Sequence, residues 1–303
     1  MTLTRTITTQ SGPGLTPQRP IGRRFSTRKF MSRYVTGILA ILVSIVVFIV
    51  PFAFILLTAA KNPQEASLFE FSLPQQGWFL FENIAAVIET RNFMLLRAFI
   101  NSTVLTVASV TLMVILAGMV GYVLQRRKSR WNIVINFFVL AGLIVPPAIV
   151  PTIWVMQALG IFKTMPGMIL VEVTFGLSFC ILLFRAFVAT IPRELDEAAL
   201  IDGAGPLRLF FSVVLPLLKP VVVTVIVVQS VAVFNDFTGP LYFLPGEANA
   251  TVQLTLYNFQ SQAVSQWNLL FANILLITIP PLIMYIFFNR QIQEGMTSGA
   301  VKG

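Results

Sequence analysis

The sequence contains no histidine, and its 303 residues include a single cysteine, Cys180. Without histidine the chain lacks the usual general base, metal ligand and proton relay of enzymes. A single cysteine excludes an intramolecular disulfide and a cysteine-based metal cluster. The sequence also lacks the G-x-x-x-x-G-K-[ST] phosphate loop, so we do not expect an ATPase site. We therefore expect neither an enzyme nor a cofactor bound by this chain.

Charge is also scarce, because only 11% of the residues are charged and 56% are hydrophobic. A soluble domain carries about 25% charged residues. A run of about 20 apolar residues is long enough to cross a bilayer as a helix. The sequence predicts an all-α integral membrane protein with six transmembrane helices between residues 34 and 289, at 34–60, 97–124, 131–162, 167–187, 219–240 and 268–289.

The basic residues are unevenly distributed. A net charge of +9 could indicate nucleic-acid binding, but the charges lie in short segments between apolar runs. If the spans alternate, 17 of the 21 lysines and arginines fall on one side, in residues 1–33, 125–130, 185–219 and 290–303. Cytoplasmic loops carry this excess. We therefore expect both termini in the cytoplasm, with residues 1–33 a disordered basic segment and residues 290–303 a tail.

One cytoplasmic segment differs from the apolar runs. Residues 192–220 read PRELDEAALIDGAGPLRLFFSVVLPLLKP. Pro192 and the acidic residues after it suit a helix N-terminus, and Gly203, Gly205 and Pro206 end that helix. A second amphipathic helix follows, with Leu207, Phe210, Phe211 and Val214 expected on one face. The segment is thus predicted to be a helix–turn–helix, which periodicity alone does not distinguish from an ordinary connector.

The order of residues in this segment resembles a known motif. Glu197-Ala198-Ala199, a glycine six residues after Glu197, and a later Leu-Pro pair are similar to the EAA loop of binding-protein-dependent ABC importers. In that family the loop docks into a cleft on a cytoplasmic ATPase. The resemblance implies an ATPase-coupling role for Glu197, Ala198, Ala199, Asp202, Gly203, Leu215 and Pro216.

The end of the chain carries a second resemblance. Residues 294–303, EGMTSGAVKG, resemble the tail of the second permease of maltose-type sugar importers, which reaches between the two ATPase subunits. The resemblance implies a coupling role for Lys302 and Gly303. The plainer interpretation is a frayed terminus.

Two pairs of residues are candidates for a substrate path. Pro146 and Pro147 interrupt the third predicted span, and a broken helix at membrane depth lines a cavity or packs on protein. Asn235 and Asp236 are polar groups at the end of the fifth span, where such groups face the bundle interior or water. They either line a sugar path or bond to a neighbouring loop at a helix end.

The resemblance implies a permease subunit for a sugar or oligosaccharide in a bacterial inner membrane. Its implied partners are a second homologous permease, a homodimeric ABC ATPase that uses ATP, and an extracytoplasmic solute-binding protein. A polyol, glycerol phosphate or peptide permease is the nearest alternative. A self-sufficient secondary transporter would need ionisable residues deep in its spans, whereas Glu172 and Asp236 lie near the predicted outer ends.

Overall fold

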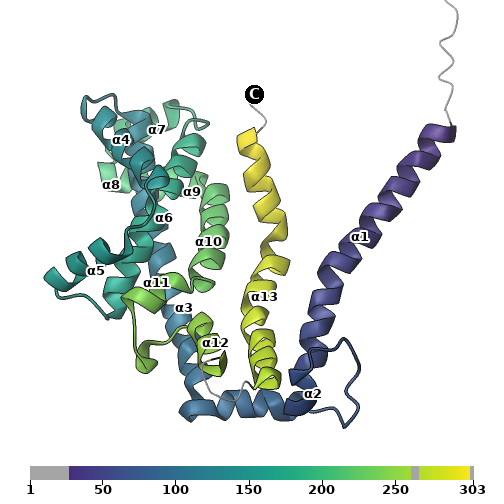
Figure 1. The fold of residues 1–303 in the computed structure, drawn as a ribbon. Coiled ribbons are helices and arrows are strands. Elements are labelled where there is room, and N and C mark those ends of the chain that lie inside the picture. The colour runs from purple at the N-terminus through teal and green to yellow at the C-terminus, as the bar shows by residue number, and fades with distance from the viewer. Residues whose placement is uncertain (1–26, 261–265, 301–303) are drawn as a thin grey trace, which may run out of the picture. The chain divides into compact units, whose positions relative to one another are not determined.

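The computed structural model describes residues 27–260 and 266–300. Every regular element in these ranges is a helix. The chain forms two compact units that divide after Pro51, within α1 (Thr27–Ala59). In the first unit α1 is a single continuous helix (Figure 1). Its side chains from Thr36 to Phe52 are exposed, although they form one of the most apolar stretches of the chain. Exposed apolar residues of this kind suit contact with lipid or another membrane helix.

The second unit begins with the end of α1, followed by α2 (Pro63–Ser67) and α3 (Leu80–Arg126). Within α3 the backbone is non-helical from Thr90 to Phe93, and Arg91, Asn92 and Phe93 have positive φ angles. The second span was predicted within residues 97–124, and the part of α3 after this break contains those residues. The break at 90–93 turns the first part of α3, which begins at Leu80, across the direction of the rest (Figure 1).

The predicted third span is broken, as the sequence indicated. It forms α4 (Trp131–Ile144) and α5 (Ile149–Ala158), and Pro146 and Pro147 lie in the break between them. At 1.5 Å per residue, neither helix alone is long enough to cross a hydrocarbon core of about 30 Å. The fourth predicted span is confirmed as one long apolar helix, α6 (Met165–Val188).

The polar segment forms a series of short helices. It begins with α7 (Glu194–Ile201) and continues with α8 (Pro206–Arg208), the π-helical turn η1 (Leu209–Val214) and α9 (Leu215–Leu217). The chain then bends by 79° into α10 (Lys219–Phe234). The remaining elements are α11 (Thr238–Phe243), the 3₁₀ turn η2 (Glu247–Asn249), α12 (Val252–Gln260) and α13 (Trp267–Ala300).

By length and composition, four helices of the described residues can cross a membrane, or five if the bent pair ending in α10 is one span. The four are α1, α3, α6 and α13. The number is below the predicted six for two reasons. The third predicted span is divided between α4 and α5, and α10 ends at Phe234 rather than continuing to Pro240.

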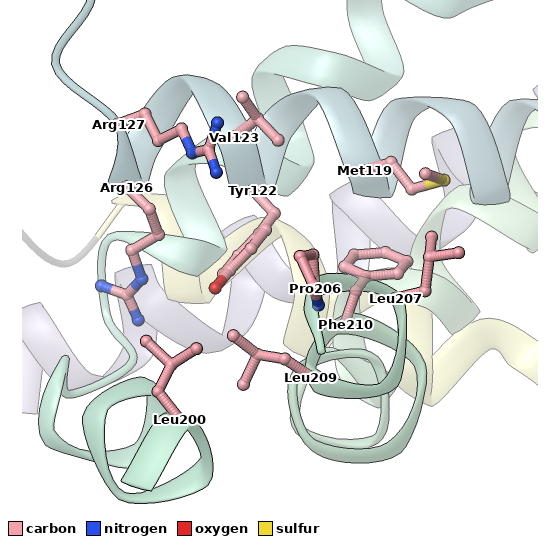
Figure 2. Close-up of a pocket in the computed structure, with 10 residues that line it drawn as sticks. All are labelled: Met119, Tyr122, Val123, Arg126, Arg127, Leu200, Pro206, Leu207, Leu209 and Phe210. Atoms are coloured by element: carbon pink, nitrogen blue, oxygen red, sulfur yellow. The ribbon is translucent and has the colours of Figure 1, made fainter. Parts of the chain in front are cut away.

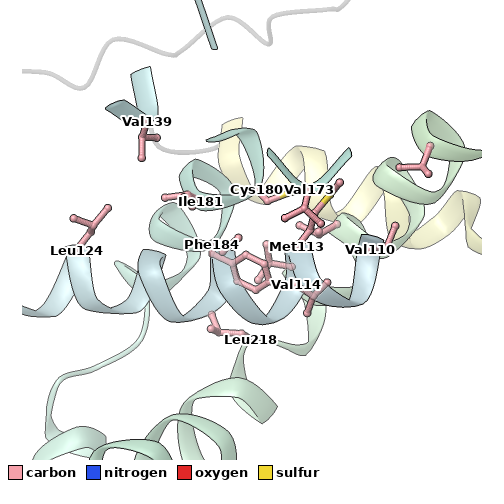
Figure 3. Close-up of a cluster of buried hydrophobic side chains, with 14 of the residues drawn as sticks. Val110, Met113, Val114, Leu124, Val139, Val173, Cys180, Ile181, Phe184 and Leu218 are labelled. Atoms are coloured by element: carbon pink, nitrogen blue, oxygen red, sulfur yellow. The ribbon is translucent and has the colours of Figure 1, made fainter. Parts of the chain in front are cut away.

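The core of the second unit lies where α3 packs against α6 and α10. Val110, Met113 and Val114 of α3 contact a buried cluster that includes Cys180, Ile181 and Phe184 of α6 (Figure 3). Glycine allows the two helices to approach closely. A Cβ atom at Gly121 would lie 2.9 Å from Phe184 Cβ and 3.0 Å from the Arg185 backbone nitrogen. Small residues permit such backbone approach between membrane helices.

We predict that Gly121→Ala destabilises the α3–α6 interface by about 1–3 kcal/mol, because an added methyl group forces backbone to move in a packed core. The measurement is the unfolding temperature of the purified chain in detergent. Gly37→Ala is the matched control, since among the described residues no atom lies within 4 Å of a Cβ atom at that helical position. Equal unfolding temperatures for the two variants would contradict the prediction.

Candidate functional site

The helix α7 ends in a turn at Gly203, where the backbone needs a residue that tolerates a positive φ angle. Gly203 has φ +78°, a left-handed conformation that disfavours most side chains. The Gly203 N–H donates to the Leu200 carbonyl (3.0 Å) and the Ala204 N–H donates to the Ala199 carbonyl (3.0 Å). This pair of hydrogen bonds is a Schellman motif, and it sets the turn between α7 and α8.

The outer face of α7 is exposed in the described part of the chain. Glu197, Ala198 and Asp202 are exposed, and the Ile201 side chain is 86% exposed. Ala199 is different, because it is buried in the core cluster of this chain. The resemblance implied a coupling role for both alanines. Of the two alanines, only Ala198 is exposed and can contact a partner.

The inner face of α7 is held by an ion pair. Arg126 Nε at the end of α3 lies 2.7 Å from Asp196 Oδ2, and both side chains are about nine-tenths buried. An Arg126 terminal nitrogen also donates to the Ile191 carbonyl at 3.0 Å. One arginine therefore fixes both α7 and the chain that leads into it to the end of α3.

The second helix of the segment exposes a different face from the one predicted. Leu209, Phe210 and Val214 are buried, whereas Leu207 and Phe211 are 63% and 44% exposed. The prediction of one face containing Leu207, Phe210, Phe211 and Val214 assumed a regular α-helix. The π-helical turn over Leu209–Val214 changes the rotation per residue, so the predicted face is divided.

The other candidate coupling residues lie farther along the chain. Leu215 is half-buried and Pro216 is exposed, both in α9, and the η1 turn before them contacts α7. The backbone of α13 is helical to Ala300. Lys302 and Gly303 lie outside the described residues.

The candidate path residues come from two separate segments. Pro146 and Pro147 are exposed in the break after α4. Asn235 follows α10, where its Nδ2 donates to the Val231 carbonyl (2.9 Å) and its Oδ1 accepts from Gln253 Nε2 (3.0 Å). The Asp236 carboxylate accepts from the Thr238 and Gly239 backbone N–H groups, each at 3.0 Å. These hydrogen bonds are the helix-end contacts that the sequence left open, and a path-lining role stays a prediction.

The exposed helix, the glycine turn and the buried ion pair lie in a region that is shared with a known protein family. The model of the family described as "Binding-protein-dependent transport system inner membrane component" matches residues 113–298. The chain belongs to this family. The matched region contains α4 to α10 and almost all of α13, so it includes the whole of residues 192–220.

Curated members of this family are similar along most of their length. The permease protein NgcG of a diacetylchitobiose uptake system from Streptomyces coelicolor is 32% identical, over 91% of each chain. The permease protein AmyC of a probable transport system for starch degradation products, from Thermoanaerobacterium thermosulfurigenes, is 29% identical over 90% of this chain and 98% of its own. A chain of a bacterial ABC transporter that imports the polysaccharide alginate shares the fold, with TM-score 0.74, 19% identity and coverage of 88% and 98%.

The Arg126–Asp196 pair is the part of this permease-family site that the sequence analysis missed. Arg126 was interpreted as one of the basic residues that mark the cytoplasmic side. Asp196 was interpreted as one of the acidic residues that favour a helix N-terminus. The two residues are 70 positions apart, so no local pattern joins them. A buried partner for a basic loop residue could have been found only from the tertiary packing of α7 against α3.

We predict that Asp196→Asn destabilises the second unit by about 3–5 kcal/mol, because it leaves the buried Arg126 without its counter-charge. Trypsin should also cut faster after the exposed Arg193, since the loop loses its anchor. Glu247→Gln is the control, because the Arg91–Glu247 pair is exposed at 31% and 69% and such pairs contribute at most about 1 kcal/mol. Equal losses in the two variants would show that the pair does not hold the loop.

Proposed function

We propose that this family member is a permease subunit of an ATP-driven importer for a sugar or oligosaccharide, coupled to its ATPase through residues 192–220. The observation that carries the proposal is the outer face of α7, where Glu197, Ala198, Ile201 and Asp202 are exposed beside a fixed glycine turn. A rigid helix with an acidic residue, a small residue and a large exposed apolar side chain suits insertion into a cleft on a protein partner.

The arrangement in the membrane follows the charge distribution. Six spans require that α4 and α5 together form the third and that α10, α11 and the chain between them complete the fifth. The N-terminus and the tail after residue 289 are then cytoplasmic, on the side of α7. In this arrangement residues 1–33 precede the membrane domain 34–289, and Lys302 and Gly303 reach the ATPase from the tail.

The partners follow from the family and from the solved assemblies that resemble this chain. One structural neighbour, with TM-score 0.62 and 14% identity, is an alginate transporter in complex with an alginate-pentasaccharide-bound periplasmic protein. We propose a second homologous permease, two copies of a cytoplasmic ABC ATPase and an extracytoplasmic binding protein for this chain. A bacterial inner membrane is the expected location.

The mechanism that these contacts support is a rigid-body motion. Closure of the ATPases on ATP would displace α7, and the Arg126–Asp196 pair would carry that displacement to α3. Because α3 packs against α6 and α10, the bundle would move with it between inward-open and outward-open states. ATP hydrolysis on the partner would reset the motion, and the permease itself supplies no chemical step.

The solute class rests on the relatives and on the tail of the chain. The compared relatives are named for starch degradation products and diacetylchitobiose, and the tail resembles that of a sugar permease. Asn235 and Asp236, with Pro146 and Pro147, are the proposed path residues. The alternative solute is a polyol or glycerol phosphate. A competition experiment would distinguish them, because unlabelled sugars reduce uptake of the labelled solute only if the permease carries sugars.

We predict that Glu197→Gln reduces recovery of the ATPase, because docking loses a charged hydrogen bond of about 1.5–3 kcal/mol. The measurement is a mild-detergent purification from the native membrane, with mass spectrometry of the proteins that accompany the chain. Glu194→Gln is the matched control, since Glu194 is an exposed acidic residue of the same helix outside the predicted docking set. The docking assignment fails if both variants retain the ATPase equally.

We expect a bulky residue at Gly203 to uncouple ATP hydrolysis from uptake while the spans remain inserted. Two substitutions separate the causes. Gly203→Asn tolerates the positive φ, so it tests the added side chain, whereas Gly203→Val also strains the turn. Because no atom of residues 27–260 and 266–300 lies within 4 Å of a Cβ atom at Gly203, a loss of coupling in the asparagine variant reports on the partner. Normal coupled uptake by both variants would remove Gly203 from the docking site.

A further inference from the structure

A cavity lies between the end of α3 and residues 192–220, which are called the docking segment below. Its volume is about 370 Å³. One wall comes from α3, through Met119, Tyr122 and Val123. The other comes from the docking segment, through Leu200, Pro206, Leu207, Leu209 and Phe210. Figure 2 shows the two walls facing each other across the opening. Motion of α7 and α8 relative to α3 therefore changes the shape of this cavity.

The cavity has a polar end and an apolar end. Arg126 and Arg127 lie at one end, and Met119 and Leu207 lie at the other (Figure 2). Met119 and Arg126 are seven residues apart on α3, which corresponds to about 10 Å at 1.5 Å per residue. An acyl chain segment of about that length, with an anionic group at one end, matches this gradient in size and in charge.

Arg127, at the polar end, can bind an anionic group. Arg126 is engaged by Asp196 and the Ile191 carbonyl, whereas Arg127 is exposed and forms no ion pair within the described part of the chain. Lys128 and Arg130 follow it. Trp131 is 61% exposed at the start of α4, and tryptophan in this position is typical of the membrane–water interface. The polar end thus lies where lipid headgroups are found if α3 crosses the membrane.

The walls suit a hydrocarbon chain better than a peptide. Apart from Tyr122 and the two arginines, all the lining side chains are apolar. A peptide segment in the cavity would bury backbone N–H and C=O groups with few partners, which costs free energy. An acyl chain has no such groups. Its burial is favourable, and a phosphate group can accept hydrogen bonds from an arginine.

We propose that this cavity binds an anionic phospholipid of the cytoplasmic leaflet, with an acyl chain against Met119 and Val123 and the phosphate on Arg127. The inference rests on the proposed orientation of the docking segment. Because the bound chain contacts both α3 and the docking segment, it would stabilise one position of α7. Coupling between ATP hydrolysis and uptake should then depend on the anionic lipid content of the membrane.

The experiment uses the complex purified with its partner subunits. It is placed in nanodiscs of phosphatidylcholine with or without phosphatidylglycerol as the anionic lipid. Lipids retained after detergent extraction are identified by native mass spectrometry. Arg127→Gln removes the phosphate contact and Val123→Trp fills the cavity from an exposed position. Arg130→Gln is the matched control, because it removes the same charge from the same loop but does not line the cavity.

We expect the unaltered chain and Arg130→Gln to retain phosphatidylglycerol. Retention should fall about tenfold in Arg127→Gln, as for loss of one charge-assisted contact, and also in Val123→Trp. An equal loss in Arg127→Gln and Arg130→Gln would show general electrostatic attraction and overturn the proposal. Equal retention of phosphatidylcholine and phosphatidylglycerol would overturn it as well.

The same samples distinguish failure of this inference from failure of the proposed function. Recovery of the ATPase is scored together with the lipid. If the ATPase is present and phosphatidylglycerol is not selectively retained, the lipid site is wrong while the importer assignment stands. If the unaltered chain carries no ATPase but retains the lipid with the predicted selectivity, the proposed function is wrong and the cavity assignment stands.

Discussion

The buried ion pair between Arg126 and Asp196 is the interaction on which the position of the docking segment depends. The helix α7 has eight residues, and isolated helices of that length are not stable in water. Tertiary contacts must therefore hold it. Asp196 provides one contact through its charge and Ala199 another through burial. With its inner face held, α7 presents its outer face in a fixed orientation, which reduces the entropic cost of binding a partner.

Close packing carries this local constraint into the bundle. Gly121 brings α3 near the backbone of α6, and Gly118 leaves room for the Phe210 ring, which a Cβ atom there would meet at 3.2 Å. Phe210 belongs to the η1 turn, so α3 contacts both the docking segment and the membrane helix α6. A packed interior transmits displacement instead of absorbing it. This continuity would let a motion of α7 reach α6.

The sequence predicted the features that have local causes. The break at Pro146, the apolar helix at α6 and the glycine turn at Gly203 follow from backbone preferences and hydropathy. What it could not predict depends on contacts between distant segments. The π-helical turn in η1 changed which side chains of 206–217 are buried. Lys61 is a further case. It directly follows the first predicted span, 34–60, where a solvent-exposed loop charge is expected, but it is 98% buried and its Nζ donates to the Glu70 carbonyl and to Ser72 Oγ.

The central claim is that the outer face of α7 is an ATPase-binding surface, and cysteine labelling tests it most directly. The single native Cys180 is buried, so Ala198→Cys introduces one exposed thiol, and Ala199→Cys one residue later is a buried control. The account predicts that maleimide labels Cys at 198 in the chain alone and that the bound ATPase blocks this labelling, while position 199 is labelled slowly in both states. Equal labelling at 198 with and without the ATPase would contradict the account.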